Sequence, residues 1–211
     1  MSSESRSDDA AIGGNLYNKY ESRNPIVRRL VAGFERSLRS LLAPIGPVRT
    51  VLEVGCGEGY VTAMLASALP EARLLATDVS PEIVEIARRQ QPGIEFEVCS
   101  IYDVAALGTW DLVVACEVFE HLDDPQRALD AMAAAARGHV LVSVPREPLW
   151  RILNVARGSY WQALGNTHGH LQHWGRRSLS AFLATRFDVV ATRTPLPWTQ
   201  VLARSRPGGP A

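Results

Sequence analysis

The chain has 211 residues, a length typical of one domain. Apolar residues make up 46% of it and charged residues 21%, which is the composition of a globular protein and excludes general disorder. No apolar run reaches the roughly 18–20 residues that a membrane-spanning helix needs, and the N-terminus lacks the pattern of a secretion signal. We therefore expect a cytoplasmic protein without a membrane span.

The charges balance, with 22 basic and 22 acidic residues. Proteins that bind nucleic acid usually carry a basic excess, so we expect no nucleic-acid partner. A homodimer is left open. Cys56, Cys99 and Cys116 are odd in number and lie in apolar segments, which indicates free thiols in a reducing compartment.

Helical and strand-like segments alternate along the chain. Residues 1–14 and 204–211 lack apolar periodicity and are predicted to be a disordered and a flexible tail, which leaves residues 15–203 as one domain. The predicted helices cover residues 25–42, 59–69, 81–89, 125–138 and 178–185. The predicted strands cover residues 48–54, 72–77, 94–98, 110–115, 139–144, 187–193 and 198–203.

This alternation predicts an α/β fold, a mainly parallel sheet with helices on both faces. Such sheets bind ligands at the carboxyl ends of their strands, near the point where the strand order reverses. The stretch of about residues 145–178 interrupts the alternation and is rich in Trp, His, Gly and Arg. We predict that it is a lid inserted after the fifth strand.

A glycine-rich loop follows the first predicted strand, at Gly55-Cys56-Gly57-Glu58-Gly59. Glycines let backbone N–H groups come close to a ligand, and the N-terminus of the next helix favours an anionic group. A dinucleotide site would have a third glycine at the position of Tyr60. An NAD(P)-dependent oxidoreductase is therefore a remote alternative.

An acidic residue, Asp78, ends the second predicted strand. A carboxylate at this place can accept hydrogen bonds from both hydroxyls of a ribose. The alternative is that Asp78 caps the next turn, because Asp-x-Ser-Pro favours turns. In combination with the glycine loop, the position favours the ribose.

Four segments, in this order, resemble the class I S-adenosylmethionine-dependent methyltransferases: VLEVGCGEGY, ATDVSPEIVEIAR, WDLVVACEVFEHLDDP and HVLVSVP. The resemblance covers about residues 48–144. It implies a Rossmann-like, doubly wound sheet of seven strands whose last strand is antiparallel. It also implies that S-adenosylmethionine binds over the ends of the first two strands.

The resemblance also assigns residues to the cofactor. The glycine loop with Glu53 would line the methionine part, Asp78 would hold the ribose, and Val79 would pack on the adenine. Ser100 stands where the family commonly has an acidic residue, so its hydroxyl, the backbone of Ile101, or Asp103 would serve the adenine. The residues implied at the cofactor are Glu53, Gly55, Cys56, Gly57, Asp78, Val79, Ser100, Ile101, Cys116, Glu117 and Tyr20.

The run Glu117-Val118-Phe119-Glu120-His121 resembles that of quinone-pathway O-methyltransferases, where it is associated with metal. If the run is helical, Glu117, Glu120 and His121 share one face and can bind a divalent cation that lowers the pKa of an acceptor hydroxyl. Two alternatives are that the polar groups orient the loop and that His121 is a metal-free base. We do not favour the metal.

The predicted lid carries three further candidates for a catalytic base, His168, His170 and His173. Histidine is the usual base at neutral pH because its unperturbed pKa is about 6.5. The alternative is that these histidines are solvated or capping residues.

Four residues are candidates for acceptor binding. Trp150 and Trp174 would line an aromatic pocket, although they would serve equally to pack the lid onto the sheet. Arg146 would pair with an anionic acceptor, and Tyr17, with Tyr20, resembles N-terminal tyrosines that close over the cofactor.

The sequence thus predicts methyl transfer from S-adenosylmethionine to a small molecule, with S-adenosylhomocysteine as product. A hydroxyl oxygen is favoured as acceptor because the candidate bases cluster near the site. Nitrogen and carbon acceptors stay open, as does a non-catalytic module that only binds the cofactor.

Overall fold

The computed structural model describes residue 20, residues 22–146, residue 172 and residues 174–206. Within these residues a seven-stranded sheet has the order β3-β2-β1-β4-β5-β7-β6. Strands β1 to β5 pair in parallel, and β7 is antiparallel to both β5 and β6, which confirms the predicted Rossmann-like sheet. The strands are β1 Thr50–Val54, β2 Arg73–Asp78, β3 Glu95–Val98, β4 Trp110–Cys116, β5 Ala136–Pro145, β6 Phe187–Arg193 and β7 Trp198–Ser205.

Five α-helices and two 3₁₀ helices connect the described strands. Three of the α-helices begin with a proline that follows a capping residue, and the side chains of Asn24, Ser80 and Asp124 each accept a hydrogen bond from the first turn. Because a capping residue followed by proline can be recognised in the sequence, the starts of these three helices were predicted correctly. The helices are α1 Pro25–Leu42, α2 Tyr60–Ala68, α3 Pro81–Gln90, η1 Ile101–Leu107, η2 Phe119–His121, α4 Pro125–Ala135 and α6 Arg176–Leu183.

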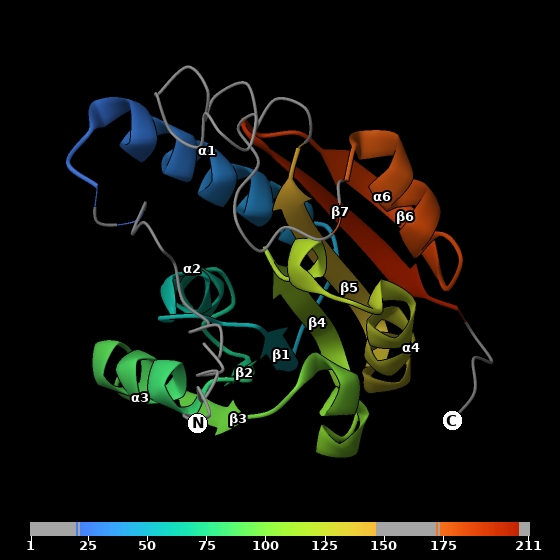
Figure 1. The fold of residues 1–211 in the computed structure, drawn as a ribbon, viewed down its shortest axis with the longest axis horizontal. Helices are drawn as coiled ribbons and strands as arrows, with labels where there is room; N and C mark the ends of the chain where they lie inside the picture. The colour runs from blue at the N-terminus through green and yellow to red at the C-terminus, as the bar shows by residue number, and fades with distance from the viewer. Residues whose placement is uncertain (1–19, 21, 147–171, 173, 207–211) are drawn as a thin grey trace, which may run out of the picture.

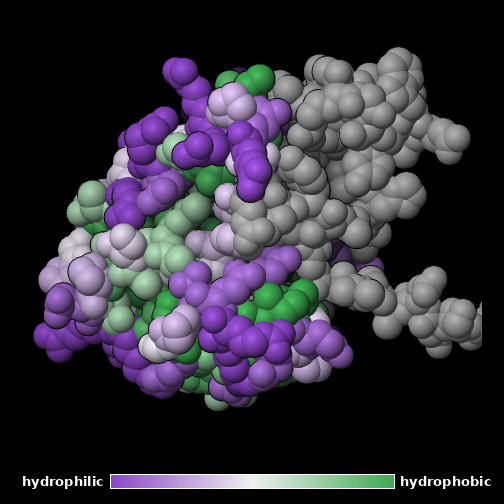
Figure 2. Space-filling view, turned by 90° about the vertical axis from the view of Figure 1, so that its left-hand side faces the viewer, coloured by the Kyte–Doolittle hydropathy of each residue, from purple (hydrophilic) through white to green (hydrophobic). Residues whose placement is uncertain are grey.

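The helices cover both faces of the sheet. Helices α1, α2 and α3 lie on one face, and α4 and α6 lie on the other (Figure 1). Each face has its own core, and successive strand residues alternate between the two, so Val51 packs under α1 to α3 while Leu52 packs under α4 and α6. On the side of α2 and α3, hydrophilic residues dominate the described surface, with smaller hydrophobic areas between them (Figure 2). No described helix is long and apolar enough to cross a membrane.

The sheet extends further along the chain than predicted at two places. The helix predicted through Gly138 ends at Ala135, and β5 already begins at Ala136, which pairs with Trp110 of β4. Strand pairing here overrides the helical preference of the alanine-rich run. Strand β7 continues to Ser205, so the predicted tail at 204–211 begins two residues too early. The predicted tail at 1–14 and most of the predicted lid at 145–178 lie outside the described residues.

Candidate functional site

The glycine loop makes a tight turn from β1 into α2. Gly55, Gly57 and Gly59 have φ values of 70°, 54° and 88°, a left-handed conformation that favours glycine. The N–H of Cys56 donates to the carbonyl of Thr77 at 2.9 Å, which ties the loop to β2. A Cβ added to Gly55 would lie 2.4 Å from Cγ2 of Val118, so the loop also packs closely against the segment after β4.

Gly57 differs from Gly55 in its surroundings. A Cβ added to Gly57 would meet no atom within 4 Å. Packing inside the chain therefore leaves room above this residue, where a bound molecule can come close to the backbone. The backbone of the loop is therefore open to a ligand here, without a side chain in the way.

Asp78 links the loop to the end of β2. Its Oδ2 accepts from the N–H of Gly57 at 3.0 Å, and its Oδ1 accepts from the N–H of Ser80 at 3.1 Å. An ionised carboxylate has about four acceptor positions, so two stay available for a pair of ribose hydroxyls. The cap and the ribose contact are therefore compatible. Val79 is 67% exposed beside it and offers an apolar surface.

Glu53 is buried beneath the loop, with 1% of its surface exposed. Burial raises its pKa to about 8, the hydroxyl of Thr62 opposes this shift, and Asp78 adds to it. Thr62 was not predicted as a site residue, although its place in the first turn of α2 faces the strand end. Burial also raises the pKa of the Cys56 thiol, with Glu53 next in effect.

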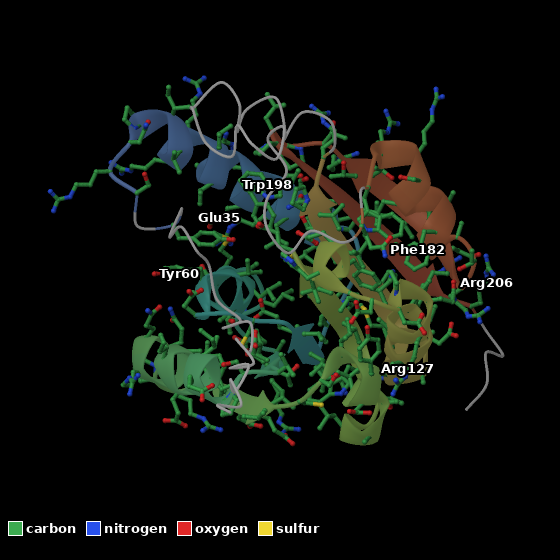
Figure 3. All side chains as sticks on the ribbon, in the orientation of Figure 1. Glu35, Tyr60, Arg127, Phe182, Trp198 and Arg206 are labelled. Carbon is green, nitrogen blue, oxygen red and sulfur yellow. The ribbon has the colours of Figure 1, made fainter. Side chains whose placement is uncertain are left out.

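Tyr20 brings the N-terminal segment to the same place. Its ring stacks on that of Tyr60 at 4.7 Å between centroids and 12° between planes, and Figure 3 labels Tyr60 on α2. Burial and then Glu117, Cys116 and Glu53 raise the pKa of Tyr20. The aromatic pair therefore lies beside the carboxyl ends of β1 and β4. The sequence analysis used Tyr60 only as evidence against a dinucleotide site and did not predict its contact with Tyr20.

The segment after β4 completes the site. Glu117 has a φ of 61° and donates its N–H to the carbonyl of Ser143 at 2.8 Å. A residue other than glycine in this conformation is uncommon and is often found at functional sites. The charged groups that shift the pKa of Tyr20, Glu53 and Cys56 are all acidic. Acidic side chains therefore gather around Tyr20 and the glycine loop.

The run Glu117–His121 does not form the predicted helix face. Glu117 lies outside any helix, Glu120 is buried, and His121 is exposed at the end of η2. Because the left-handed turn at Glu117 separates it from η2, the geometric premise for a shared metal site is wrong. Among the described residues, no group of three or more His, Cys, Asp or Glu side chains is placed to hold a metal ion.

Ser100 and Ile101 lie after β3, as predicted, with defined local roles. The hydroxyl of Ser100 accepts from the N–H of Tyr102 at 3.3 Å and caps η1. The side chain of Ile101 is buried in the core under α4 and α6. An adenine at this turn would therefore contact its backbone atoms and not the side chain of Ile101.

Two of the predicted acceptor residues are described. Arg146 follows β5, and its N–H donates to the carbonyl of Pro197 at 2.8 Å. The ring of Trp174 packs 4.8 Å from that of Phe182 on α6, and Figure 3 labels Phe182. The remaining predicted residues, Tyr17, Trp150, His168, His170 and His173, lie outside the described part of the chain.

A cavity of about 240 Å³ lies elsewhere, at the amino ends of β2 and β3. It is lined by residues of the turns that lead into these strands, among them Pro70, Arg73 and Gly93. Ligands of parallel sheets bind at the carboxyl ends, so this cavity does not belong to the site.

Comparisons with known proteins agree with this geometry. A family model described as "Methyltransferase domain" matches residues 52–138. Trans-aconitate 2-methyltransferase of Azoarcus sp. is 31% identical over 132 residues, 59% of this chain and 52% of that protein. Ubiquinone biosynthesis O-methyltransferase of Xanthomonas campestris is 31% identical over 150 residues, 66% of this chain and 62% of that protein. The chain thus spans only about half the length of such curated relatives.

The fold has solved counterparts. Magnesium protoporphyrin IX methyltransferase from Synechocystis, crystallised with S-adenosylhomocysteine, superposes with a TM-score of 0.67. The alignment covers 88% of this chain and 89% of that chain at 18% identity. Residues 52–138 thus match a methyltransferase domain, and the sheet that contains them has the fold of a solved methyltransferase.

Proposed function

We propose that this protein transfers a methyl group from S-adenosylmethionine to a hydroxyl oxygen of a small molecule. The observation that carries the proposal is the loop at Gly55–Gly59, which is bound to the carboxylate of Asp78 and open above Gly57. The surrounding charges are acidic, which suits a ligand with a positive sulfur and an ammonium group.

The residues of the chain would divide the binding work. S-adenosylmethionine supplies a methyl group that is already activated by the positive charge on its sulfur. Asp78 would accept the ribose hydroxyls, and the loop N–H groups and Glu53 would hold the amino-acid part. Glu117 and Tyr20 would border the sulfur. Because the methyl group is activated, the main contribution of the protein is to orient the acceptor, which can supply several kcal/mol.

An oxygen acceptor is supported by the relatives. Malonyl-[acyl-carrier protein] O-methyltransferase of Anoxybacillus flavithermus and the ubiquinone biosynthesis enzyme are both O-methyltransferases by name. The base that would take the hydroxyl proton stays a prediction, with His121 and the three lid histidines as candidates.

Calorimetry with Asp78→Ala tests the proposal. We expect wild-type protein to bind S-adenosylmethionine and not NADH, and the variant to bind at least about tenfold more weakly, which corresponds to the loss of one charge-assisted hydrogen bond. Ser205→Ala, far from the loop, is the control variant. Unchanged affinity of Asp78→Ala, or preferential binding of NADH, would contradict the proposal. Mass spectrometry of hydroxylated metabolites for the gain of one methyl then identifies the acceptor.

A further inference from the structure

The carboxyl edge of the sheet continues beyond the candidate site, over β5, β7 and β6. Strand β5 ends at Pro145, which pairs with Trp198 at the start of β7. Strand β6 ends near the same edge, because Arg193 pairs with Gln200 of β7. Helices α1 and α6 each end shortly before the amino end of a strand, so both helices begin at this carboxyl edge (Figure 1).

The first turns of α1 extend past the end of the sheet. The ring of Phe34 lies 5.2 Å from that of Trp198, which is the first residue of β7 (Figure 3). The nine helical residues before Phe34 add a length of about 13 Å. Ile26 in this extension is 68% exposed, and Leu196 in the loop between β6 and β7 is 52% exposed. Two large apolar side chains therefore project from separate elements at the same edge.

Arginines surround these apolar side chains. They lie early in α1 and α6 and at the ends of β5 and β6, and they are Arg28, Arg29, Arg146, Arg176, Arg177 and Arg193. All are exposed except Arg146, which is half-buried. The first turns of α1 and α6 contain no acidic residue. Nitrogen-tipped side chains project outward from both helices (Figure 3). This part of the edge is therefore positively charged.

The arginines near the opposite, amino edge of the sheet are arranged differently. There, a carboxylate oxygen lies within 3.0 Å of the guanidinium of Arg73, Arg137, Arg186 and Arg206. Within the described part of the chain, no ion pair involves the arginines of the carboxyl edge. The described carboxylates thus neutralise the amino edge and leave the carboxyl edge with a charge that suits an external anion.

The spacing of these arginines suits an extended anionic surface rather than one small anion. Helices α1 and α6 lie on opposite faces of the sheet, so their arginines are separated by roughly 20 Å, about two helix diameters. One small molecule does not reach both. A soluble acidic protein would need a hollow for each projecting apolar side chain. The headgroup layer of a membrane accepts such side chains without a matching shape, and anionic headgroups attract clustered arginines.

We infer that the carboxyl edge over β5, β7 and β6, with the starts of α1 and α6, docks on a membrane that contains anionic lipids. The arginines bind the headgroups, and Ile26 and Leu196 enter the boundary between headgroups and acyl chains. The candidate site lies at the same edge of the sheet, so docking turns it towards the lipid. The docking does not depend on methyl transfer, and its test is therefore separate from that of the proposed function.

Co-sedimentation of the whole protein with vesicles tests the inference. One set of vesicles contains equal parts of phosphatidylglycerol and phosphatidylcholine, and the other contains phosphatidylcholine alone. Two variants each remove a pair of charges, and a third removes the apolar side chains: Arg28→Gln/Arg29→Gln, Arg176→Gln/Arg177→Gln and Ile26→Ser/Leu196→Ser.

The matched control is Arg49→Gln/Arg89→Gln, which removes two exposed arginines near the amino edge. All the substituted side chains are exposed, so the melting temperatures should stay close to that of the wild type and show that each variant is folded. We expect the wild type to bind the anionic vesicles and not the neutral ones. Salt at about 0.5 M should release it, because salt screens the charges.

Loss of either arginine pair at the carboxyl edge should weaken binding to anionic vesicles about thirtyfold, and loss of the two apolar side chains at least about tenfold. The control variant should keep the affinity of the wild type. The inference is overturned if the wild type does not bind anionic vesicles, if it binds both kinds equally, or if the control variant loses as much affinity as the others.

Two soluble polyanions, polyglutamate and duplex DNA, separate a membrane from other anionic partners. Membrane docking predicts that the wild type binds both more weakly than it binds anionic vesicles. Equal or tighter binding of either polyanion would overturn the inference in favour of an acidic protein or a nucleic acid. Unchanged vesicle binding by Ile26→Ser/Leu196→Ser would overturn it as well, because no side chain would then enter the lipid.

Discussion

Replacement of Gly55 by alanine tests how the loop is packed. Two costs act on the new side chain. The left-handed φ of 70° costs an L-residue about 1–2 kcal/mol. The new Cβ would also lie 2.4 Å from Cγ2 of Val118, and overpacking of this kind costs about 1–3 kcal/mol. We therefore expect Gly55→Ala to lower the free energy of unfolding by about 2–5 kcal/mol, or the melting temperature by about 5–15 °C.

Two further variants separate these costs. Gly46 has a similar φ of 77° and would meet no atom within 4 Å, so Gly46→Ala should show the backbone cost alone. In the double variant Gly55→Ala/Val118→Ala the nearest remaining atom of residue 118 is its Cβ at 3.5 Å, an ordinary contact. Wild type, Gly55→Ala, Val118→Ala and the double variant form a double-mutant cycle. Urea unfolding of these four proteins should show that Val118→Ala reduces the cost of Gly55→Ala by about 1–3 kcal/mol. Additive effects, or equal losses for Gly55→Ala and Gly46→Ala, would refute the reasoning.

Three other outcomes follow from the structure. Arg137 and the N–H groups of residues 49 and 50 lower the pKa of Asp111 to about 2, so the ionised carboxylate stabilises the fold above pH 4. We expect urea unfolding to show a loss of about 1–2 kcal/mol of stability as the pH falls from 4 to 2. Asp111→Asn should lack this loss. Burial raises the pKa of Glu53 from 4.5 to about 8, so the folded state holds a proton that the unfolded state releases, and stability should fall as the pH rises from 4.5 to 8. Glu53→Gln should remove that fall, and a wild type with a flat profile would contradict the assignment. Gly138→Ala should unfold at least about 1–3 kcal/mol more easily than the wild type, because its Cβ would lie 2.3 Å from the backbone oxygen of Asp111. Gly33→Ala, whose Cβ would meet only the end of the Arg36 side chain at 4.0 Å, serves as control.

Much of the fold could be predicted because its local signals agree with its tertiary structure. Each capping residue followed by proline gave a helix start, and each apolar run between turns gave a strand. The prediction failed at Ala136, where four alanines and a later glycine resemble the end of a helix. There the pairing of β5 with β4 decides the conformation, and pairing depends on residues distant in sequence.

Most of the residues predicted at the cofactor lie together in the structure, whereas most of those predicted at the acceptor lie outside the described residues. Glu53, Gly57 and Asp78 are close together because they end neighbouring parallel strands, which a strand-by-strand interpretation can locate.

The reversal of strand order between β1 and β4 has a consequence for how such proteins diversify. Strands β1 to β3 hold the glycine loop and Asp78, whereas β4, β5 and β7 hold Cys116, Ser143 and Gln200. The two groups of strands come from separate stretches of the chain, before and after η1. A chimera that exchanges the second stretch would keep the glycine loop and Asp78 but would replace Cys116 and the Val118 side chain that packs on Gly55, so both stretches have to fit each other where β1 pairs with β4.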